Sequence, residues 1–227
     1  MMPPGPPGLR KTILFRFMAG FIVVALCLFV PAGSLNFWQA WVYMGVIFAP
    51  LVFVVRYFLK RDPGLLERRM RMREKEDPQK RIQAIAGILF FIGFLIPGLD
   101  YRYGWSSVPV PGVLTADSVV FLGYLFIFLV FRENSYASRI IEVEAGQRVI
   151  TTGPYALVRH PMYLGFTLMF LATPLALGSW WALLLFLPIP AFLVFRIRNE
   201  EEVLARELPG YIEYSRKTRY RLVPVIW

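Results

Sequence analysis

The sequence predicts an all-α, polytopic helical membrane protein with about six transmembrane helices (five to six), and two observations carry this prediction. Of the 227 residues, 57% are apolar and 18% are charged, with a mean hydropathy of +0.53. A soluble domain is about 45–50% apolar and about 25% charged. The apolar residues also gather in runs close to the roughly 20 residues that a helix needs to cross a bilayer. We therefore expect one membrane domain over residues 1–227.

The expected spans follow one another with short breaks rich in Gly and Pro. They are residues 12–32, 38–59, 83–98, 113–131, 161–178 and 180–197. The third run is the shortest, and its length leaves open whether it spans the whole bilayer. Arg10 and Lys11 precede the first run, as in a signal peptide. That run is longer than an ordinary signal-peptide core and no Ala-x-Ala site follows it, so we expect it to be retained.

The placement of the charges predicts the orientation. The chain has 25 Lys and Arg against 15 Asp and Glu, a net charge of +10. Such an excess indicates either a nucleic-acid surface or the cytoplasmic side of a membrane protein. If the N-terminus is cytoplasmic, Arg102 is the one basic residue in an outer loop. The distribution therefore predicts cytoplasmic termini and a membrane-lipid environment, with no nucleic-acid partner and an oligomeric state that stays open.

Two further features fit a membrane boundary. In the segment 60–81, Leu65, Leu66, Met70 and Met72 interleave with arginines, which predicts an amphipathic cytoplasmic helix lying on anionic headgroups. The tryptophans fall at expected interfaces, where this residue type anchors helices. They are Trp38, Trp41, Trp105, Trp180, Trp181 and Trp227.

Composition and motifs exclude several chemistries. Cys27 and His160 are the only residues of their types, so neither an intrachain disulfide nor a Cys/His zinc site is expected, and we predict no metal. Glycine-rich dinucleotide and P-loop motifs and a serine-hydrolase elbow are absent. Asp100 and Asp117 lie near the outer ends of spans rather than in their middle, which argues against a transporter.

Polar residues concentrate between Thr151 and Gly165, just before the fifth expected span. Pro161 restricts His160 to extended backbone and suits the first position of a helix. We therefore expect that helix to begin there, with its N-terminal amides and positive dipole end facing the cytoplasmic boundary, where they favour an anionic group. Arg159 adds a fixed charge with bidentate hydrogen-bonding capacity.

A second polar cluster, from Arg196 to Leu204, ends the sixth expected span. A tight turn at Gly178-Ser179 joins the last two spans. Antiparallel helices of equal rise would then place His160 level with Arg198, within about one turn of Arg196, Glu200 and Glu201. The two clusters are consistent with an ordinary juxtamembrane charge network or with a site, and spacing alone names no reaction.

These residues also carry a resemblance. The pieces are Gly153-Pro-Tyr155, Arg159-His-Pro-x-Tyr163-x-Gly165, Arg196-x-x-x-Glu200-Glu201-x-x-Leu204 and Tyr211-x-x-Tyr214. In order and spacing, over about residues 146–224, the sequence resembles the membrane methyltransferases that include isoprenylcysteine carboxyl methyltransferase and the phospholipid N-methyltransferases. It departs from the prenylcysteine enzymes at Glu202 and at Pro209-Gly210-Tyr211, which leaves the methyl acceptor open.

The resemblance implies transmembrane helices over residues 1–145 and a cofactor-binding, catalytic half over 146–227. The implied cofactor is S-adenosylmethionine, bound under a cytoplasmic cap, while a lipophilic substrate enters from the bilayer. The implied cofactor-binding residues are Gly153, Tyr155, His160, Pro161, Tyr163, Glu200 and Glu201. The implied catalytic residues at the reacting end are Arg159, Arg196 and Glu201.

Several functions fit this resemblance. Carboxyl O-methylation of a prenylcysteine-like acceptor comes first, and N-methylation of a phospholipid or other lipid amine second. An NADPH-dependent lipid or sterol reductase is a rival, because some membrane reductases resemble these enzymes in their C-terminal half. A non-enzymatic lipid-binding or transport protein is another. The expected location is a bacterial inner or plasma membrane or, in a eukaryote, the endoplasmic reticulum, with the site on the cytoplasmic side.

Overall fold

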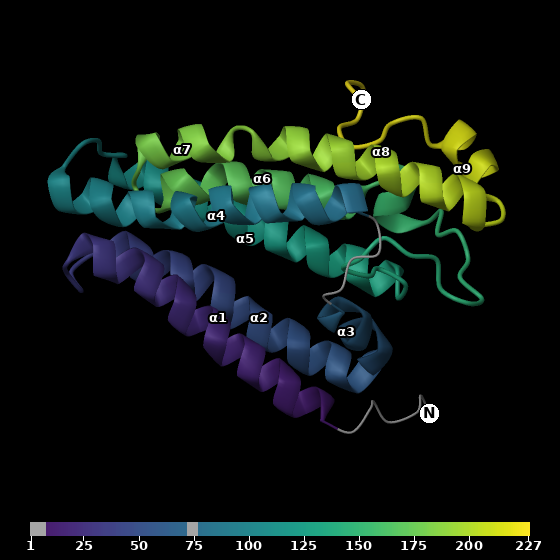
Figure 1. The fold of residues 1–227 in the computed structure, drawn as a ribbon, viewed down its shortest axis with the longest axis horizontal. Helices are drawn as coiled ribbons and strands as arrows, with labels where there is room; N and C mark the ends of the chain where they lie inside the picture. Colours follow the sequence, from purple (N-terminus) through teal and green to yellow (C-terminus); the bar gives the residue numbers. More distant parts are fainter. Residues whose placement is uncertain (1–7, 72–76) are drawn as a thin grey trace.

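The computed structural model describes residues 8–71 and 77–227, and over these ranges the fold is all-α. The elements are α1 (Leu9–Ala32), α2 (Trp38–Arg61), α3 (Pro63–Met70), α4 (Asp77–Tyr103), α5 (Val110–Glu133), the 3₁₀ turn η1 (Gly153–Ala156), α6 (Pro161–Ala176), α7 (Trp180–Phe186), α8 (Ile189–Glu207) and α9 (Tyr211–Lys217). Figure 1 shows α4 to α8 running along the long axis, with α1 and α2 forming a hairpin beneath them.

The expectation of a polytopic helical membrane protein is confirmed. Within the part of the chain that the structure describes, four helical segments are long and apolar enough to cross a bilayer: Leu9–Ala32, Trp38–Arg61, Val110–Glu133 and Trp180–Glu207. The fifth expected span is a shorter apolar helix, α6, with 16 residues. The third expected run, residues 83–98, lies within α4. This helix has 27 residues and is therefore longer than the apolar run itself.

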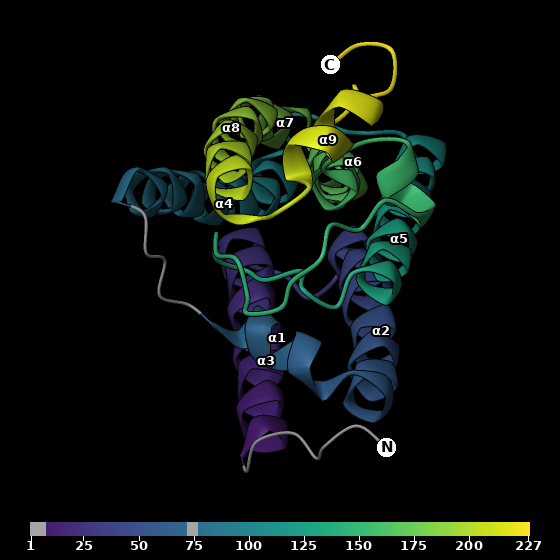
Figure 2. The same cartoon turned by 90° about the vertical axis from the view of Figure 1, so that its right-hand side faces the viewer.

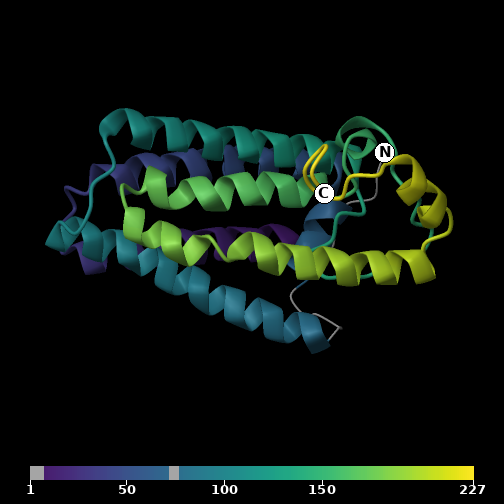
Figure 3. The ribbon, with the colours of Figure 1, turned by 90° about the horizontal axis from the view of Figure 1, so that it is seen from above.

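The sixth expected span is not one continuous helix. It is divided into α7 and α8, with Leu187 and Pro188 between them. Pro188 and Pro190 lack backbone N–H groups, so the intrahelical ladder is interrupted there. The two pieces still run in the same general direction (Figure 3), so α8 continues the path of α7 toward the other end of the bundle.

The pairing of α5 with α6 sets the position of the site. Gly123 and Gly165 allow the two backbones to approach closely, as small residues do between membrane helices. A Cβ on Gly165 would lie 2.6 Å from Cγ1 of Ile127, and one on Gly123 would lie 2.7 Å from Cγ of Met169. Seen end-on, α6 lies between α5 and α8 (Figure 2). Gly165 thus has a packing role that fixes the helix beginning beside His160.

The prediction that the segment after α2 lies on lipid headgroups is wrong for the part that the structure describes. Asp62 caps α3 by accepting a 3.0 Å hydrogen bond from the Leu65 N–H. Leu65 and Leu66 are buried in a cluster with residues of α1, α2 and α5. Arg68 and Arg69 donate to the backbone carbonyls of Ser135 and Ser138. The helix is amphipathic, but its apolar face packs on protein; Met72 lies outside the described residues.

The end of the bundle away from α9 is closed by a polar cap. Ser179 begins α7 by accepting from the Ala182 N–H, and its hydroxyl donates to buried Asp100. Asp100 also accepts from the N–H and hydroxyl of Ser106, each at 2.6 Å. The exposed tryptophans Trp38, Trp41, Trp105, Trp180 and Trp181 belong to the helix ends and loop at this end, as an interfacial belt requires. Trp227 instead packs against Arg221, whose Cζ lies 5.3 Å from the centre of the Trp227 ring.

Candidate functional site

The antiparallel hairpin of α6 and α7–α8 brings the two polar clusters together, as the sequence predicts. Gly178, with φ of +77°, makes the turn in a conformation that favours glycine. At the other end of the hairpin, Nδ1 of His160 is 4.0 Å from Glu200 Oε1, and its Nε2 is 3.3 Å from Glu201 Oε1. The predicted alignment of His160 with the end of the last span is therefore correct to within one helical turn.

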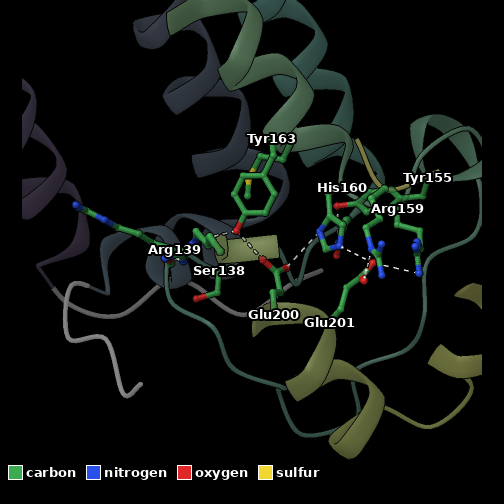
Figure 4. Close-up of polar contacts among 12 residues, drawn as sticks. Ser138, Arg139, Tyr155, Arg159, His160, Tyr163, Glu200 and Glu201 are labelled. Atoms are coloured by element: carbon green, nitrogen blue, oxygen red, sulfur yellow. Dashed lines mark hydrogen bonds and ion pairs between the residues drawn. The ribbon is translucent and has the colours of Figure 1, made fainter. Parts of the chain in front are cut away.

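Glu201 is the centre of a buried ion-pair cluster (Figure 4). Its Oε1 lies 3.1 Å from Nη1 of Arg159, and its Oε2 accepts a 2.7 Å hydrogen bond from Nε of Arg221. The side chains of Arg159, His160 and Glu201 are 10%, 4% and 11% exposed. Low exposure to solvent strengthens these electrostatic contacts, so removing one partner would lower the stability of the folded protein.

Glu200 links His160 to a second chain of contacts. The Tyr163 hydroxyl donates to Glu200 Oε2 over 2.6 Å and accepts from Nε of Arg196 over 2.9 Å. Nη2 of Arg196 donates to the backbone carbonyl of Arg139 over 2.7 Å. Figure 4 shows Glu200 between the Tyr163 ring and His160. His160 thus lies beside both glutamates, whereas Tyr163 binds Glu200 and orients it.

The Gly153-Pro-Tyr155 motif forms the turn η1 beside this cluster. Gly153 has φ of +57°, and a Cβ there would lie 3.1 Å from Cδ of Glu133. The Tyr155 hydroxyl accepts a 2.8 Å hydrogen bond from Asn134, and its carbonyl accepts one from Tyr214. Burial raises the pKa of the Tyr155 phenol, and it raises the pKa of Tyr214 to about 12. Both phenols are therefore neutral at physiological pH.

The two amides that precede α6 are paired within the protein, whereas the first turn of α6 lines the cavity described below. The N–H groups of Arg159 and His160 donate to the carbonyls of Tyr220 and Arg221, both over 2.9 Å. The amides of Tyr163 and Leu164 bond to the His160 carbonyl. The C-terminal segment after α9 thus folds back over the start of α6 and pairs these two amides, and the anion site expected at the α6 N-terminus stays a prediction.

A cavity of about 100 Å³ lies inside this arrangement. Loop 134–150, η1, the start of α6, α8 and α9 enclose it. Of the residues implied by the resemblance, it is lined by Tyr155, Arg159, His160, Pro161, Tyr163, Arg196 and Glu200. Gly153 and Glu201 are not in its wall; Gly153 shapes the turn below Tyr155, and Glu201 lies behind His160, facing a second groove.

Sequence reasoning missed several residues of this region. Asn134 is the C-cap of α5 and binds Tyr155, a position that a polar residue ending an apolar run could have indicated. Arg148 and Val149 line the cavity from a loop without a periodic pattern. Arg221 lies 20 residues after Glu201, and its approach depends on the fold of the tail. Among the described residues, no group of His, Cys, Asp and Glu is placed to hold a metal ion.

Comparisons with known proteins agree with this placement. Residues 112–209 match a family model described as phospholipid methyltransferase. The chain is also similar to Delta(14)-sterol reductase of Mus musculus, with 33% identity over 105 residues, which are 43% of this chain and 25% of that protein. It thus covers about a quarter of the length of that relative. The matched segment runs from α5 through α8 and includes both polar clusters.

Proposed function

We propose that this chain, whose residues 112–209 belong to the phospholipid methyltransferase family, is an integral membrane enzyme that methylates a lipophilic acceptor with S-adenosylmethionine. The observation that carries the proposal is the cavity itself. The four motifs of the resemblance, spread over residues 153–214, converge on one cavity, which Tyr155, Tyr163, Glu200 and Tyr214 line.

The residues around the cavity fit this cofactor. Glu200 supplies a carboxylate for the cofactor's ammonium group, and the rings of Tyr155 and Tyr163 supply faces that attract a positively charged sulfur. Val149 and Ile150 supply apolar surface for an adenine ring. The cavity of about 100 Å³ is smaller than ordinary small-molecule pockets of about 300–1,000 Å³. We therefore expect loop 134–150 and α9 to act as the cap and to move outward when the cofactor binds.

Bound S-adenosylmethionine supplies an electrophilic methyl group on a sulfonium. The contribution of the protein is to align the acceptor, exclude water and match charge, without a covalent intermediate. Tyr163 holds Glu200 in place through its 2.6 Å hydrogen bond. Arg196, held by Tyr163 and by the Arg139 carbonyl, provides a cation for an anionic group of the acceptor.

Two acceptor classes are consistent with this site. A carboxylate, as in a prenylcysteine-like compound, needs a cation such as Arg196 for orientation and no general base. A lipid amine, which the family match favours, needs a proton removed. Of the two glutamates that line the cavity, Glu142 is paired with Arg71, which leaves Glu200 as the candidate base. The two are distinguished by supplying each acceptor with radiolabelled cofactor and finding which lipid gains the label.

The first test measures cofactor binding by calorimetric titration of the detergent-purified protein. We expect S-adenosylmethionine to bind and NADPH not to bind. The second candidate, an NADPH-dependent reductase, rests on the similarity to a sterol reductase. Binding of NADPH alone would establish that candidate instead, whereas binding of neither would point to a non-enzymatic lipid-binding protein.

We also propose six spans, cytoplasmic termini and a cytoplasmic site. In a Cys27→Ala background, a membrane-impermeant thiol reagent applied to intact cells is expected to label Ser107→Cys and to leave Glu213→Cys unlabelled until the cells are opened. Both positions are exposed, so access depends on the side of the membrane. The reverse labelling pattern contradicts the proposed topology.

A further inference from the structure

Asp117 is a carboxylate buried inside the membrane-spanning part of the bundle. It lies on α5, about 10 Å along the helix from Val110, and is 4% exposed. Both of its carboxylate oxygens are buried and have no hydrogen-bond partner among the residues that the structure describes. Ionisable side chains within membrane spans are rare and almost always paired, so a buried one without a partner indicates a functional site.

Two hydroxyl groups from neighbouring helices lie beside this carboxylate. The contact of Gly123 with Met169 fixes the register of α5 against the antiparallel α6. In that register Asp117 lies level with Thr173, to within about one helical turn. The hydroxyl oxygens of Thr173 and Tyr43 are 3.0 Å apart, and both residues are buried. The Tyr43 phenol is close enough to Asp117 for the two groups to interact electrostatically.

Neither hydroxyl has a proton left for the carboxylate. Thr173 Oγ1 donates its proton to the Met169 carbonyl over 2.8 Å. The Tyr43 hydroxyl is therefore the donor in its contact with Thr173, which uses its one proton. One helical turn before Tyr43, on the same face of α2, Gln39 adds a buried Oε1 without a described partner. The unpartnered buried atoms at this place are thus all acceptors. They belong to what we call the Asp117 cluster, made of Gln39, Tyr43, Asp117 and Thr173.

A metal cation satisfies this cluster better than a proton or a water molecule does. A proton on Asp117 could be donated to one other oxygen only, which leaves the remaining acceptors unpaired. A water molecule supplies donors but leaves the negative charge uncompensated in an interior of low dielectric constant. A cation contacts several oxygens at once. Since the cluster has one carboxylate, a monovalent ion leaves no net charge, whereas a divalent ion leaves a buried positive charge.

We propose that the Asp117 cluster binds a monovalent metal cation, Na⁺ or K⁺, within the membrane. Asp117 supplies the charge, and the hydroxyl and amide oxygens of the other residues supply neutral ligands, as oxygens do for these ions in channels and transporters. The lack of a Cys/His zinc site does not bear on this proposal, because the ligands are all oxygens. Thr173 lies about 18 Å further along α6 than Pro161, so the site is separate from the cofactor cavity and does not depend on methyl transfer.

The test measures thermal unfolding of the whole protein in phosphatidylcholine nanodiscs, titrated separately with NaCl and KCl. N-methyl-D-glucamine chloride, whose cation is too large for the site, keeps the ionic strength constant. We expect at least one of the two salts to raise the melting temperature of the unmodified protein to a plateau, and Asp117→Asn to abolish this response. In the glucamine salt alone, Asp117→Asn should melt at or above the temperature of the unmodified protein, because the amide removes an unpaired buried charge. Glu213→Gln, which removes an exposed carboxylate from α9, is the matched control and should keep the response.

Tyr43→Phe gives an independent readout, because it keeps the ring that packs near Phe94 and removes one oxygen ligand. The salt concentration at half-maximal stabilisation should rise about tenfold, the loss of one contact to a charged group. A melting temperature of the unmodified protein that neither salt changes overturns the proposal, as does an equal response in Asp117→Asn. S-adenosylmethionine binding, titrated on the same samples, reports separately on the methyltransferase proposal.

Discussion

Glu200→Gln is expected to lower methyl transfer by about 100- to 1,000-fold, the cost of removing one preorganised electrostatic group from a reacting centre. Glu200 is one of two glutamates that line the cavity, and the Tyr163 hydroxyl holds it through a 2.6 Å hydrogen bond. The amide keeps the shape of the side chain but removes the negative charge that would bind the cofactor's ammonium group. The measurement is transfer of a labelled methyl group to membrane lipids, combined with titration of cofactor binding.

The matched control for this prediction is Glu207→Gln, on the same helix but exposed and paired with its neighbour Arg206. It should leave both transfer and cofactor binding unchanged. Activity near the unmodified level in Glu200→Gln would remove Glu200 from the site and with it the assignment of this cavity to the cofactor.

Glu201→Gln is expected to have its largest effect on stability, with a loss of about 3 kcal/mol in the free energy of unfolding. The substitution leaves the buried guanidinium of Arg159 without its carboxylate and removes the charge that Arg221 and His160 face. The Arg221 side chain is 36% exposed, so solvent screens its ion pair with Glu201. Most of the lost stability therefore comes from the buried guanidinium of Arg159. The measurement is thermal or denaturant unfolding of the detergent-purified protein.

A double variant separates the structural role of Glu201 from a chemical one. Glu201→Gln combined with Arg221→Gln should lose less stability than the sum of the single losses, because the second change removes one of the cations left uncompensated. If Glu201→Gln is instead as stable as the unmodified protein but inactive, Glu201 takes part in the reaction, as the resemblance implies.

The contrast between these glutamates shows how far sequence reasoning reaches for the site. The motif spacing and the tight turn at Gly178 predict that Glu200 and Glu201 both lie near His160, and they do. Adjacent residues on a helix point about 100° apart. Which of them faces the cavity depends on the rotation of α8 against α6, and the sequence alone does not fix that rotation. The functional roles implied for both residues stay predictions.

The same distinction applies to the polar segment after α2. Alternation of Leu65 and Leu66 with arginines predicts an amphipathic helix, and α3 is one. The pattern does not say whether the apolar face meets lipid or protein. In the structure, α1, α2 and α5 present apolar side chains at that place, while the carbonyls of Ser135 and Ser138 accept hydrogen bonds from the arginines.

By itself, the sequence determined the fold class, the helices of the bundle and the convergence of the two polar clusters, because apolar length, proline position and motif order are properties of local chain. The tertiary structure alone decided two things: the pairing of the Arg159 and His160 amides with the Tyr220 and Arg221 carbonyls, and the sides of α8 that Glu200 and Glu201 face. Each depends on contacts between residues distant in sequence, where packing and buried hydrogen bonds outweigh local preference.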